Sequence, residues 1–132
     1  MLKKLITLII LYFFSSISHA YEIKLKKIIS LDKPWGSSFI NDDELIVTEK
    51  EGKIKIVNIL NNKVSEIDHN LNFLVHGQGG LLDVIHKDNK IWISYTEKRK
   101  GQKTSTSIAK AKLDRKKLNF KNIFQANPPI DS

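Results

Sequence analysis

The stretch FINDDELIV, residues 39–47, contains a polar segment between two apolar segments. Its centre, Asn41-Asp42-Asp43, predicts a turn, because Asn and Asp side chains hydrogen-bond their own backbone and tolerate left-handed conformations. The apolar run after it contains β-branched residues, which favours a strand. Sliding the sequence by 46 residues places Leu45-Ile46-Val47 on Ile91-Trp92-Ile93. A repeat of roughly 40 to 50 residues, each copy built from short antiparallel strands, is typical of β-propeller blades.

Short strands separated by turns account for the rest of the chain, and no stretch has a convincing helical period. The sequence therefore predicts an all-β protein that supplies about two four-stranded blades of a β-propeller. The rival fold is a small standalone β-sandwich or barrel. Closed propellers have roughly four to eight blades, so we expect a longer chain or partners to complete the ring. The expected strands cover residues 21–29, 35–40, 44–49, 53–59, 63–67, 81–86, 90–97, 104–113 and 118–126.

The first 20 residues resemble an export signal. Lys3 and Lys4 precede an apolar run over residues 5–14, and Ser18-His19-Ala20 has the small-x-small pattern of a cleavage site. The apolar run is shorter than the roughly 20 residues that span a bilayer. We therefore expect residues 21–132 to form one exported domain with no stable membrane span after cleavage. The periplasm is the expected destination; secretion and anchoring by an uncleaved signal are the alternatives.

Basic residues are in excess but spread thinly. The chain has 22 Lys and Arg against 14 Asp and Glu, and most lysines alternate with apolar residues as on a solvated strand face. One dense patch, Lys98-Arg99-Lys100 with Lys103, contains no aromatic residue, so a solvated loop is favoured over nucleic-acid binding. The chain has no cysteine. Its stability must therefore come from its core or from assembly rather than from disulfides.

The glycine cluster Gly77-Gln78-Gly79-Gly80 marks the candidate binding site. Three glycines around one glutamine indicate a sharp turn and a close approach of the backbone. The Gln78 amide is both donor and acceptor, which suits a sugar hydroxyl or a quinone carbonyl. The alternative is that these residues only turn the chain between strands. Asp83, on the strand that follows, is expected to be a hydrogen-bonded structural carboxylate rather than a catalytic one.

The histidines and tryptophans give weaker indications. His76 adjoins the glycine cluster and is a candidate lining residue of the same cleft. His69 is expected to be solvated in a loop, and His86 to be partly buried at a strand end; no histidine pair has the close spacing of a zinc site. Trp35 and Trp92 lie within strand patterns, so core packing is favoured over stacking on a sugar.

Three blocks of sequence carry a family resemblance. The first block comprises PWGSSF, ELIVTEK and GKIKIV (residues 34–39, 44–50 and 52–57). The second comprises GQGGLLDV and ISYTE (residues 77–84 and 93–97). The third comprises IFQ (residues 123–125) and Pro128-Pro129. Together these blocks resemble the soluble glucose/sorbosone dehydrogenase family, over nearly all of residues 33–129. The resemblance implies a six-bladed propeller that uses pyrroloquinoline quinone (PQQ). The chain departs from the family at residues 41–44 and after His86, where customary prolines are missing.

The resemblance implies oxidation of the C1 hydroxyl of an aldose to the lactone, with hydride transfer to PQQ beside a calcium ion. An external electron acceptor then reoxidises the quinone. In the family the general-base histidine follows the Pro-Pro stretch, and most quinone and calcium ligands come from later blades. These positions lie beyond Ser132, so no catalytic residue and no metal ligand is assigned within this chain. Gln78 carries over as a ligand-binding residue, with Gly77, Gly79 and His76 beside it.

Two classes of function therefore remain open. In the first, these residues are the N-terminal part of a PQQ-dependent aldose dehydrogenase and are inactive when isolated. In the second, they form a non-catalytic exported module that binds a partner or a sugar, or a decayed remnant. The sugar, the electron acceptor and the oligomeric state are not predicted.

Overall fold

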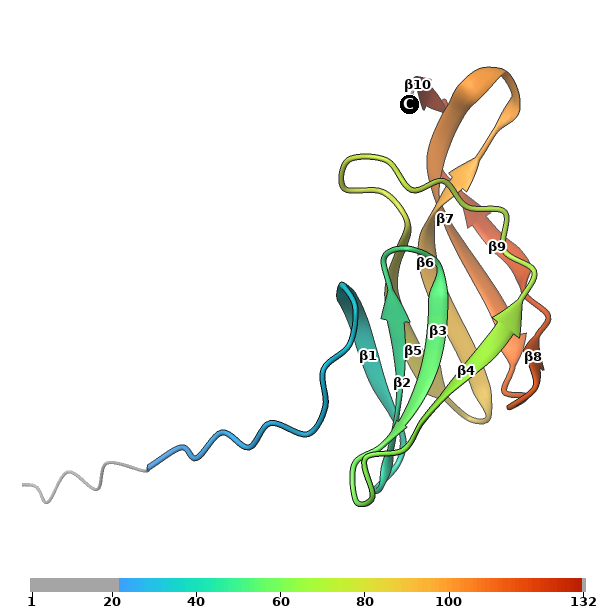
Figure 1. Cartoon of the computed structure of the whole chain (residues 1–132). Coiled ribbons are helices and arrows are strands. Elements are labelled where there is room, and N and C mark those ends of the chain that lie inside the picture. Colours follow the sequence, from blue (N-terminus) through green and yellow to red (C-terminus); the bar gives the residue numbers. More distant parts are fainter. Residues whose placement is uncertain (1–21, 132) are drawn as a thin grey trace, which may run out of the picture.

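The computed structural model describes residues 22–131 and consists almost entirely of strands (Figure 1). A short 3-10 turn, η1 (Lys100–Gln102), is the sole helical element among the described residues. The strands are β1 (Pro34–Asn41), β2 (Glu44–Glu49), β3 (Lys53–Asn58), β4 (Val64–His69), β5 (Leu81–Lys87), β6 (Lys90–Lys98), β7 (Lys103–Lys112), β8 (Lys117–Leu118), β9 (Lys121–Gln125) and β10 (Ile130–Asp131). The predicted all-β class is confirmed.

The strands form two sheets that lie side by side. The first has the order β1-β2-β3-β4-β8, and the second has the order β10-β7-β6-β5 with β9 also paired to β7. Within each sheet, consecutive long strands form antiparallel hairpins. The two sheets meet through β1 and β5, which are the first strands of their sheets along the chain and contact each other. Each sheet is thus a meander of the kind that forms a propeller blade.

Equivalent hairpins open the two sheets, which confirms the repeat. The pair Asn41↔Glu44 closes the β1–β2 turn, and Lys87↔Lys90 closes the β5–β6 turn 46 residues later. Asp88 and Asn89 both have positive φ, 50° and 57°. A two-residue turn with both residues at positive φ has a backbone twist that matches the twist of the two strands it joins. Asp and Asn tolerate this left-handed conformation.

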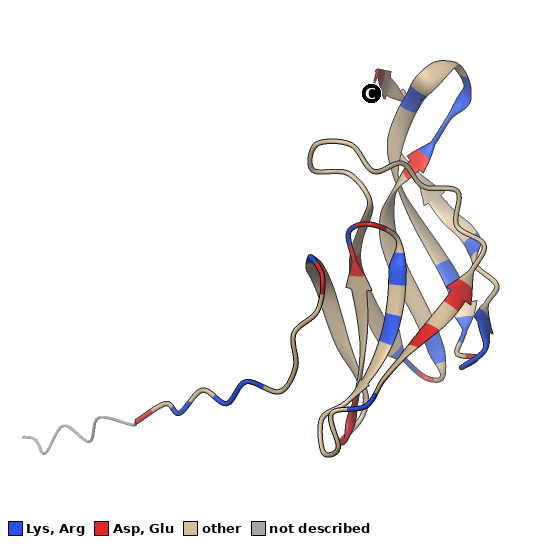
Figure 2. Ribbon diagram, viewed as in Figure 1, with Lys and Arg blue, Asp and Glu red and all other residues tan. Residues whose placement is uncertain are grey.

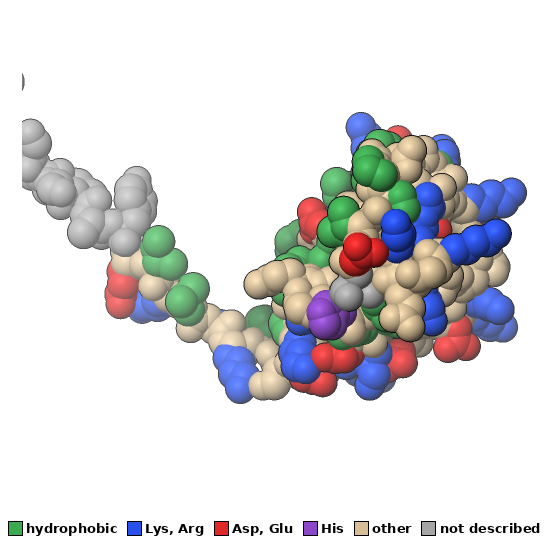
Figure 3. Space-filling view, turned by 90° about the horizontal axis from the view of Figure 1, so that it is seen from above, with side chains coloured by type: hydrophobic (Ala, Val, Ile, Leu, Met, Phe, Trp, Pro, Cys, Tyr) green, Lys and Arg blue, Asp and Glu red, His purple; other side chains and the backbone are tan. Residues whose placement is uncertain are grey.

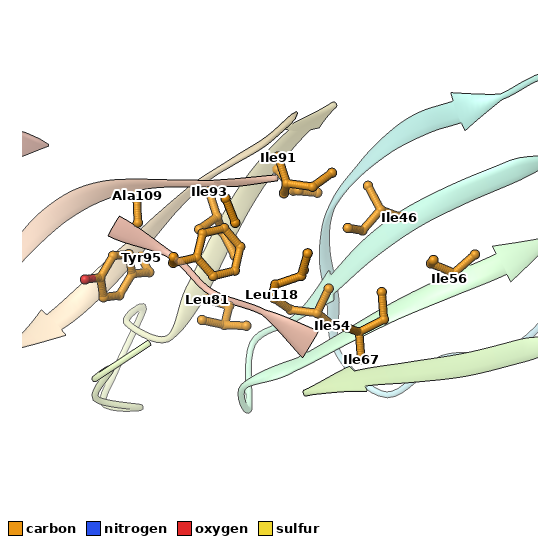
Figure 4. Packing of buried hydrophobic residues seen from close by; sticks show 13 residues of the cluster. Ile46, Ile54, Ile56, Ile67, Leu81, Ile91, Ile93, Tyr95, Ala109 and Leu118 are labelled. Carbon is orange, nitrogen blue, oxygen red and sulfur yellow. The ribbon is translucent and has the colours of Figure 1, made fainter. Parts of the chain in front are cut away.

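The hydrophobic core lies between the two sheets (Figure 4). Aliphatic side chains of the first sheet meet Leu81, Ile93 and Tyr95 of the second, and all are almost fully buried. The two inner strands come very close at Gly36, where an added Cβ would lie 2.7 Å from the Cα of Asp83. The Thr48 hydroxyl donates a hydrogen bond across this contact to the Leu82 carbonyl. The contact between sheets therefore combines apolar packing with hydrogen bonds.

The final predicted strand, residues 118–126, is divided between the two sheets. β8 pairs in parallel with β4 at the rim of the first sheet, whereas β9 pairs with β7 of the second. Leu118 and Phe120 are buried where the chain crosses. The Asn70 amide holds the crossing, since it accepts from the Phe120 N–H at 2.7 Å and donates to the Phe120 carbonyl at 3.2 Å. The sequence shows one alternating pattern here, but burial of Leu118 and Phe120 where the chain crosses requires a bend.

Two further expectations are wrong. Residues 22–29 form no strand, because no described strand pairs with them, and Ile23 and Leu25 remain 83% and 95% exposed. Trp35 is 47% exposed and Trp92 is half-buried, so neither belongs to the core cluster. Trp92 lies opposite Lys110, on the face of the second sheet that points away from the core residues Ile91 and Ile93.

The expected export signal, residues 1–20, lies outside the described residues. Within residues 22–131, no helix is long and apolar enough to cross a membrane.

Candidate functional site

A groove of about 370 Å³ forms where the β4–β5 loop passes the start of β7. The four residues that the sequence singled out lie in it together. Figure 3 looks onto the end of the molecule where this loop and the β6–β7 hairpin lie. The lining residues are His76, Gly77, Gln78, Gly79, Thr96, Thr104, Ser105, Thr106, Ile130 and Asp131.

The first sheet holds the loop through Lys50, in the turn between β2 and β3. The Lys50 ammonium donates to the Gly77 carbonyl, and the Lys50 carbonyl accepts from the Leu81 N–H at 3.2 Å. The two contacts flank Gln78 on either side. Nothing in the sequence indicates this role, because Lys50 lies 27 residues before Gly77 in a turn of charged residues.

The second sheet holds the loop through Thr96 of β6. The Thr96 carbonyl accepts from the Leu74 N–H, and the Thr96 N–H donates to the Gly80 carbonyl, both at 2.9 Å. Gly80 needs to be glycine, because its φ is +142° and an added Cβ would lie 2.2 Å from the Lys50 carbonyl oxygen. Inside the loop, the Gly79 N–H donates to the His76 carbonyl at 2.6 Å. The glycine cluster is therefore both a turn and a close approach, as predicted.

Neutral hydrogen-bonding groups dominate the groove. The Gln78 side chain is exposed there, and three threonines, Thr96, Thr104 and Thr106, contribute hydroxyl groups to the same lining. Ser105 also contacts the groove, but its side chain lies on the opposite face of β7 from Thr104 and Thr106. Its buried hydroxyl is the one such side-chain atom among the described residues that has no hydrogen-bond partner. Hydroxyls and amides both donate and accept, which fits a ligand rich in hydroxyl or carbonyl oxygens. No side chain here forms a nucleophile–base pair.

A network centred on Glu97 fixes β6, β7 and β9 next to the groove. Its carboxylate accepts hydrogen bonds from Ser107 at 2.6 Å, from Asn122 at 2.9 Å and from Gln125 at 2.8 and 2.9 Å. It also pairs with Arg99 at 3.0 Å. Burial acts to raise the pKa of Glu97, but these hydrogen bonds and the Arg99 charge outweigh it, so its pKa lies below the ordinary value. The carboxylate is thus held in its ionised form as a structural junction.

Three other candidate residues from the sequence, His69, His86 and Asp83, form hydrogen bonds with groups outside the groove. His69 is half-buried rather than solvated, since its Nε2 lies 2.7 Å from the Gly52 carbonyl and its Nδ1 accepts from the Leu71 N–H. His86 is half-buried at the end of β5, and its N–H donates to the Ser38 hydroxyl. The Asp83 carboxylate accepts from the Val84 N–H at 2.9 Å. None of these three side chains lines the groove.

The described residues do not fit a calcium site. Within residues 22–131, no three His, Cys, Asp or Glu side chains lie close enough together to hold a metal ion. The donor set of the groove does fit the carbonyl and hydroxyl oxygens of a quinone or a sugar. The groove residues that sequence reasoning missed are Thr96 and the run from Thr104 to Thr106. The sequence feature that could have identified the run from Thr104 to Thr106 is its richness in Thr and Ser, but such a composition is equally typical of an ordinary exposed strand.

The architecture therefore defines two neighbouring propeller blades with a polar groove at one end of the second. The sequence model of the family described as "Glucose / Sorbosone dehydrogenase" matches residues 31–132. The chain belongs to this family, and its sheets are part of a β-propeller rather than a standalone sandwich or barrel.

Individual relatives agree with this assignment. The chain is 26% identical over 111 residues to "Aldose sugar dehydrogenase YliI" of Escherichia coli (strain K12), covering 77% of this chain and 30% of that protein. A solved structure described as "glucose dehydrogenase" aligns with a TM-score of 0.70 and 26% identity, over 76% of this chain and 34% of its own. A PQQ-bound aldose sugar dehydrogenase from Streptomyces coelicolor shares the fold, with a TM-score of 0.63 and 19% identity over 79% of this chain and 34% of its own. The chain thus spans about a third of the length of these relatives.

Proposed function

We propose that this chain is the N-terminal part of an exported, periplasmic aldose dehydrogenase that uses PQQ. The enzyme would oxidise the C1 hydroxyl of an aldose to the lactone, and an external acceptor would take up the electrons. The observation that carries the proposal is the groove around Gln78, a hydroxyl- and amide-lined site in a member of a sugar dehydrogenase family. Sugar ligands present many hydroxyl groups, and each needs a donor or an acceptor on the protein.

In this proposal, the residues of this chain bind and orient rather than perform the chemistry. The Gln78 amide would hydrogen-bond a sugar hydroxyl or a quinone carbonyl, and Thr96, Thr104 and Thr106 would offer further hydroxyls. Lys50 and Thr96 would keep the loop in place while the ligand binds. A loop fixed before binding loses less entropy on binding, which improves both affinity and positioning.

The chemistry that bound PQQ supplies is acceptance of the hydride from C1. The groove offers the Gln78 amide and threonine hydroxyls, which suit its carbonyl oxygens. Calcium is proposed from family membership, with its ligands contributed by regions outside residues 22–131. The general-base histidine belongs to the same outside regions, so the isolated chain is expected to be inactive.

A chimera tests the proposal, because the E. coli relative contains the segments that this chain does not cover. Residues 31–131 would replace the matching segment of that relative, and the purified chimera would be reconstituted with PQQ and calcium. Dye-coupled oxidation of a panel of aldoses would be compared among the chimera, the 132-residue chain and the relative without the segment. Circular dichroism and the melting temperature would establish that each protein is folded.

The proposal expects aldose-dependent turnover from the chimera and none from the other two proteins. A folded chimera that binds PQQ but oxidises no aldose would contradict it. That outcome would favour the binding-module or remnant interpretation, with Gln78 as a residue of a structural turn.

A further inference from the structure

The two sheets differ sharply in charge. Residues 34–69, which form the first sheet apart from β8, hold seven acidic and four basic residues, a net charge of −3. Residues 81–112 and 121–125, which form the second sheet apart from β10, hold three acidic and nine basic residues, a net charge of +6. Figure 2 shows Lys and Arg spread along the second sheet and its hairpins and also on β3, while Asp and Glu mark the turns and β4 of the first sheet. Apart from β8 and β10, the second sheet therefore carries a net positive charge and the first a net negative one.

Four of these lysines line a groove at the end of β7 nearest the β5–β6 turn. β9 pairs with β7 only as far as Lys110↔Lys121, whereas β7 continues to Lys112 beside β6. A groove of about 340 Å³ lies where the two strands part. Its lining includes Asp88, Asn89, Lys90, Lys110, Lys112 and Lys121, and Asn119 approaches from the segment before β9.

The four lysines form two like-charged pairs across the ladder. Lys90 lies directly opposite Lys112, and Lys110 lies directly opposite Lys121. Like charges in directly opposed positions destabilise a sheet. Within the described residues, none of these four ammonium groups forms an ion pair with a carboxylate, and Asp88 is the one acidic residue in the lining. An anion in the groove would relieve both repulsions together.

We propose that this groove binds a phosphate-type oxyanion, held by the four ammonium groups and by the side-chain amides of Asn89 and Asn119. Lysine binds phosphate as a concentrated positive charge, and Asn supplies N–H donors to the remaining oxygens. This concave surface is lined by lysines of three strands, β6, β7 and β9, and by Asn89 and Asn119 from a turn and a connecting segment, which differs from lysines scattered over a solvated face. The site lies on a different set of residues from the Gln78 groove, so the proposal stands independently of the proposed function.

The test compares two double variants of the 132-residue chain with the same loss of charge. Lys110→Gln/Lys112→Gln breaks both lysine pairs in the groove. Lys98→Gln/Lys100→Gln removes two charges from the β6–β7 hairpin, which does not line the groove. Inorganic phosphate would be titrated at constant ionic strength, with chloride as the replaced anion. Binding would be read from the backbone amide resonances of Ala111 and Asn119 and from the melting temperature.

The proposal expects saturable shifts of these two resonances and a melting temperature that rises with phosphate. The groove variant should lose affinity by about tenfold or more, since charge-assisted hydrogen bonds are removed, while the hairpin variant stays within about twofold. Without phosphate, the groove variant should melt no lower than wild type, because two repulsions are gone. This last result also guards against a variant that simply fails to fold.

Non-saturating shifts, no shift at Ala111 and Asn119, or equal losses in both variants would overturn the proposal, since diffuse charge would then explain the binding. Two further ligands identify the source of the oxyanion. Glucose 6-phosphate binding more tightly than inorganic phosphate would assign the groove to a soluble phosphate ester. Co-sedimentation with phosphatidylglycerol vesicles, weakened in the groove variant but not in the hairpin variant, would assign it to a lipid headgroup.

Discussion

The Lys50 ammonium donates a hydrogen bond to the Gly77 carbonyl, and the Lys50 carbonyl accepts one from the Leu81 N–H at 3.2 Å. One residue of the first sheet thus fixes both sides of the loop that carries Gln78 on the second. The groove is therefore a property of the two sheets together. Its shape depends on how they pack and not on the loop sequence alone.

Replacing Lys50 by Met should loosen this loop with little loss of global stability. The side-chain contact is exposed, so the free energy of unfolding should fall by no more than about 1 kcal/mol. Hydrogen exchange at the amides of Gln78 and Gly79 should accelerate, because the Gly77 carbonyl loses its anchor. Lys53→Met, at an exposed position on β3, serves as the control. Equal exchange rates in both variants would show that Lys50 does not order the loop.

Two glycines of the cluster should respond very differently to alanine. Gly80→Ala places a Cβ 2.2 Å from the Lys50 carbonyl at a φ of +142°, so we expect a loss of about 3 kcal/mol or more. Gly77→Ala has no atom within 4 Å of the new Cβ, and only its φ of +51° opposes the change, at about 1 kcal/mol. Urea unfolding of both variants measures the difference. Similar midpoints would mean that the backbone at Gly80 is not confined as described.

An ion pair that joins β2 to the loop between β7 and β8 should make stability depend on pH. The Arg115 guanidinium contacts both oxygens of Glu44, at 2.9 and 2.6 Å. Its hydrogen bonds, followed by that of Asn41, lower the pKa of Glu44 from 4.5 to about 2. A carboxyl whose pKa falls on folding stabilises the protein above its unfolded pKa. This contribution is therefore present above pH 4.5 and is lost as the pH falls towards 2.

Glu44→Gln should lose about 0.5–1 kcal/mol at pH 7, because Arg115 is largely exposed and solvent screens the pair. At pH 2 the variant and wild type should be nearly equal. Glu66→Gln is the control, since Glu66 forms only an exposed 3.8 Å contact with Lys53. Urea unfolding at the two pH values measures the effect. A deficit for Glu44→Gln that stayed constant down to pH 2 would contradict the ion-pair account.

The Glu97 network should be worth more than the surface pairs. Glu97→Ala leaves Ser107, which is fully buried, and the amides of Asn122 and Gln125 without their shared acceptor. We expect a loss of about 2–3 kcal/mol. Glu51→Ala, an exposed pair with Lys33, should cost far less and serves as the comparison. Thermal unfolding measures both, and a small effect at Glu97 would show that β9 does not depend on this carboxylate.

The hairpins could be predicted because their turns depend on local residues. Features that depend on contacts between distant parts of the chain could not be predicted. The turns at Asn41-Asp42-Asp43 and Asp88-Asn89 follow from the residues themselves, so the repeat and the two blades could be read from the sequence. The alternation over residues 21–29 looked equally like a strand, but residues 22–29 have no neighbouring strand to pair with. Alternation describes a strand's two faces and carries no information about its neighbours.

The candidate site shows the same limit. The glycine cluster identified the loop, because glycine signals a backbone conformation directly. The partners of that loop, Lys50 and Thr96, come from the β2–β3 turn and from β6, and only the packing of the sheets brings them together. The crossing held by Asn70 and Phe120 escaped prediction for the same reason, since these two residues are 50 positions apart.

The most direct test of the central claim is the effect of Gln78→Ala on kcat/KM in the active chimera with the E. coli relative. The account predicts a loss of roughly 10- to 100-fold, the value of one or two hydrogen bonds to the sugar or the quinone. Gln102→Ala, on the exposed β6–β7 hairpin, should change kcat/KM by less than about twofold. Unchanged kcat/KM in a folded Gln78→Ala chimera would contradict the account and leave the Gln78 groove without a role in sugar oxidation.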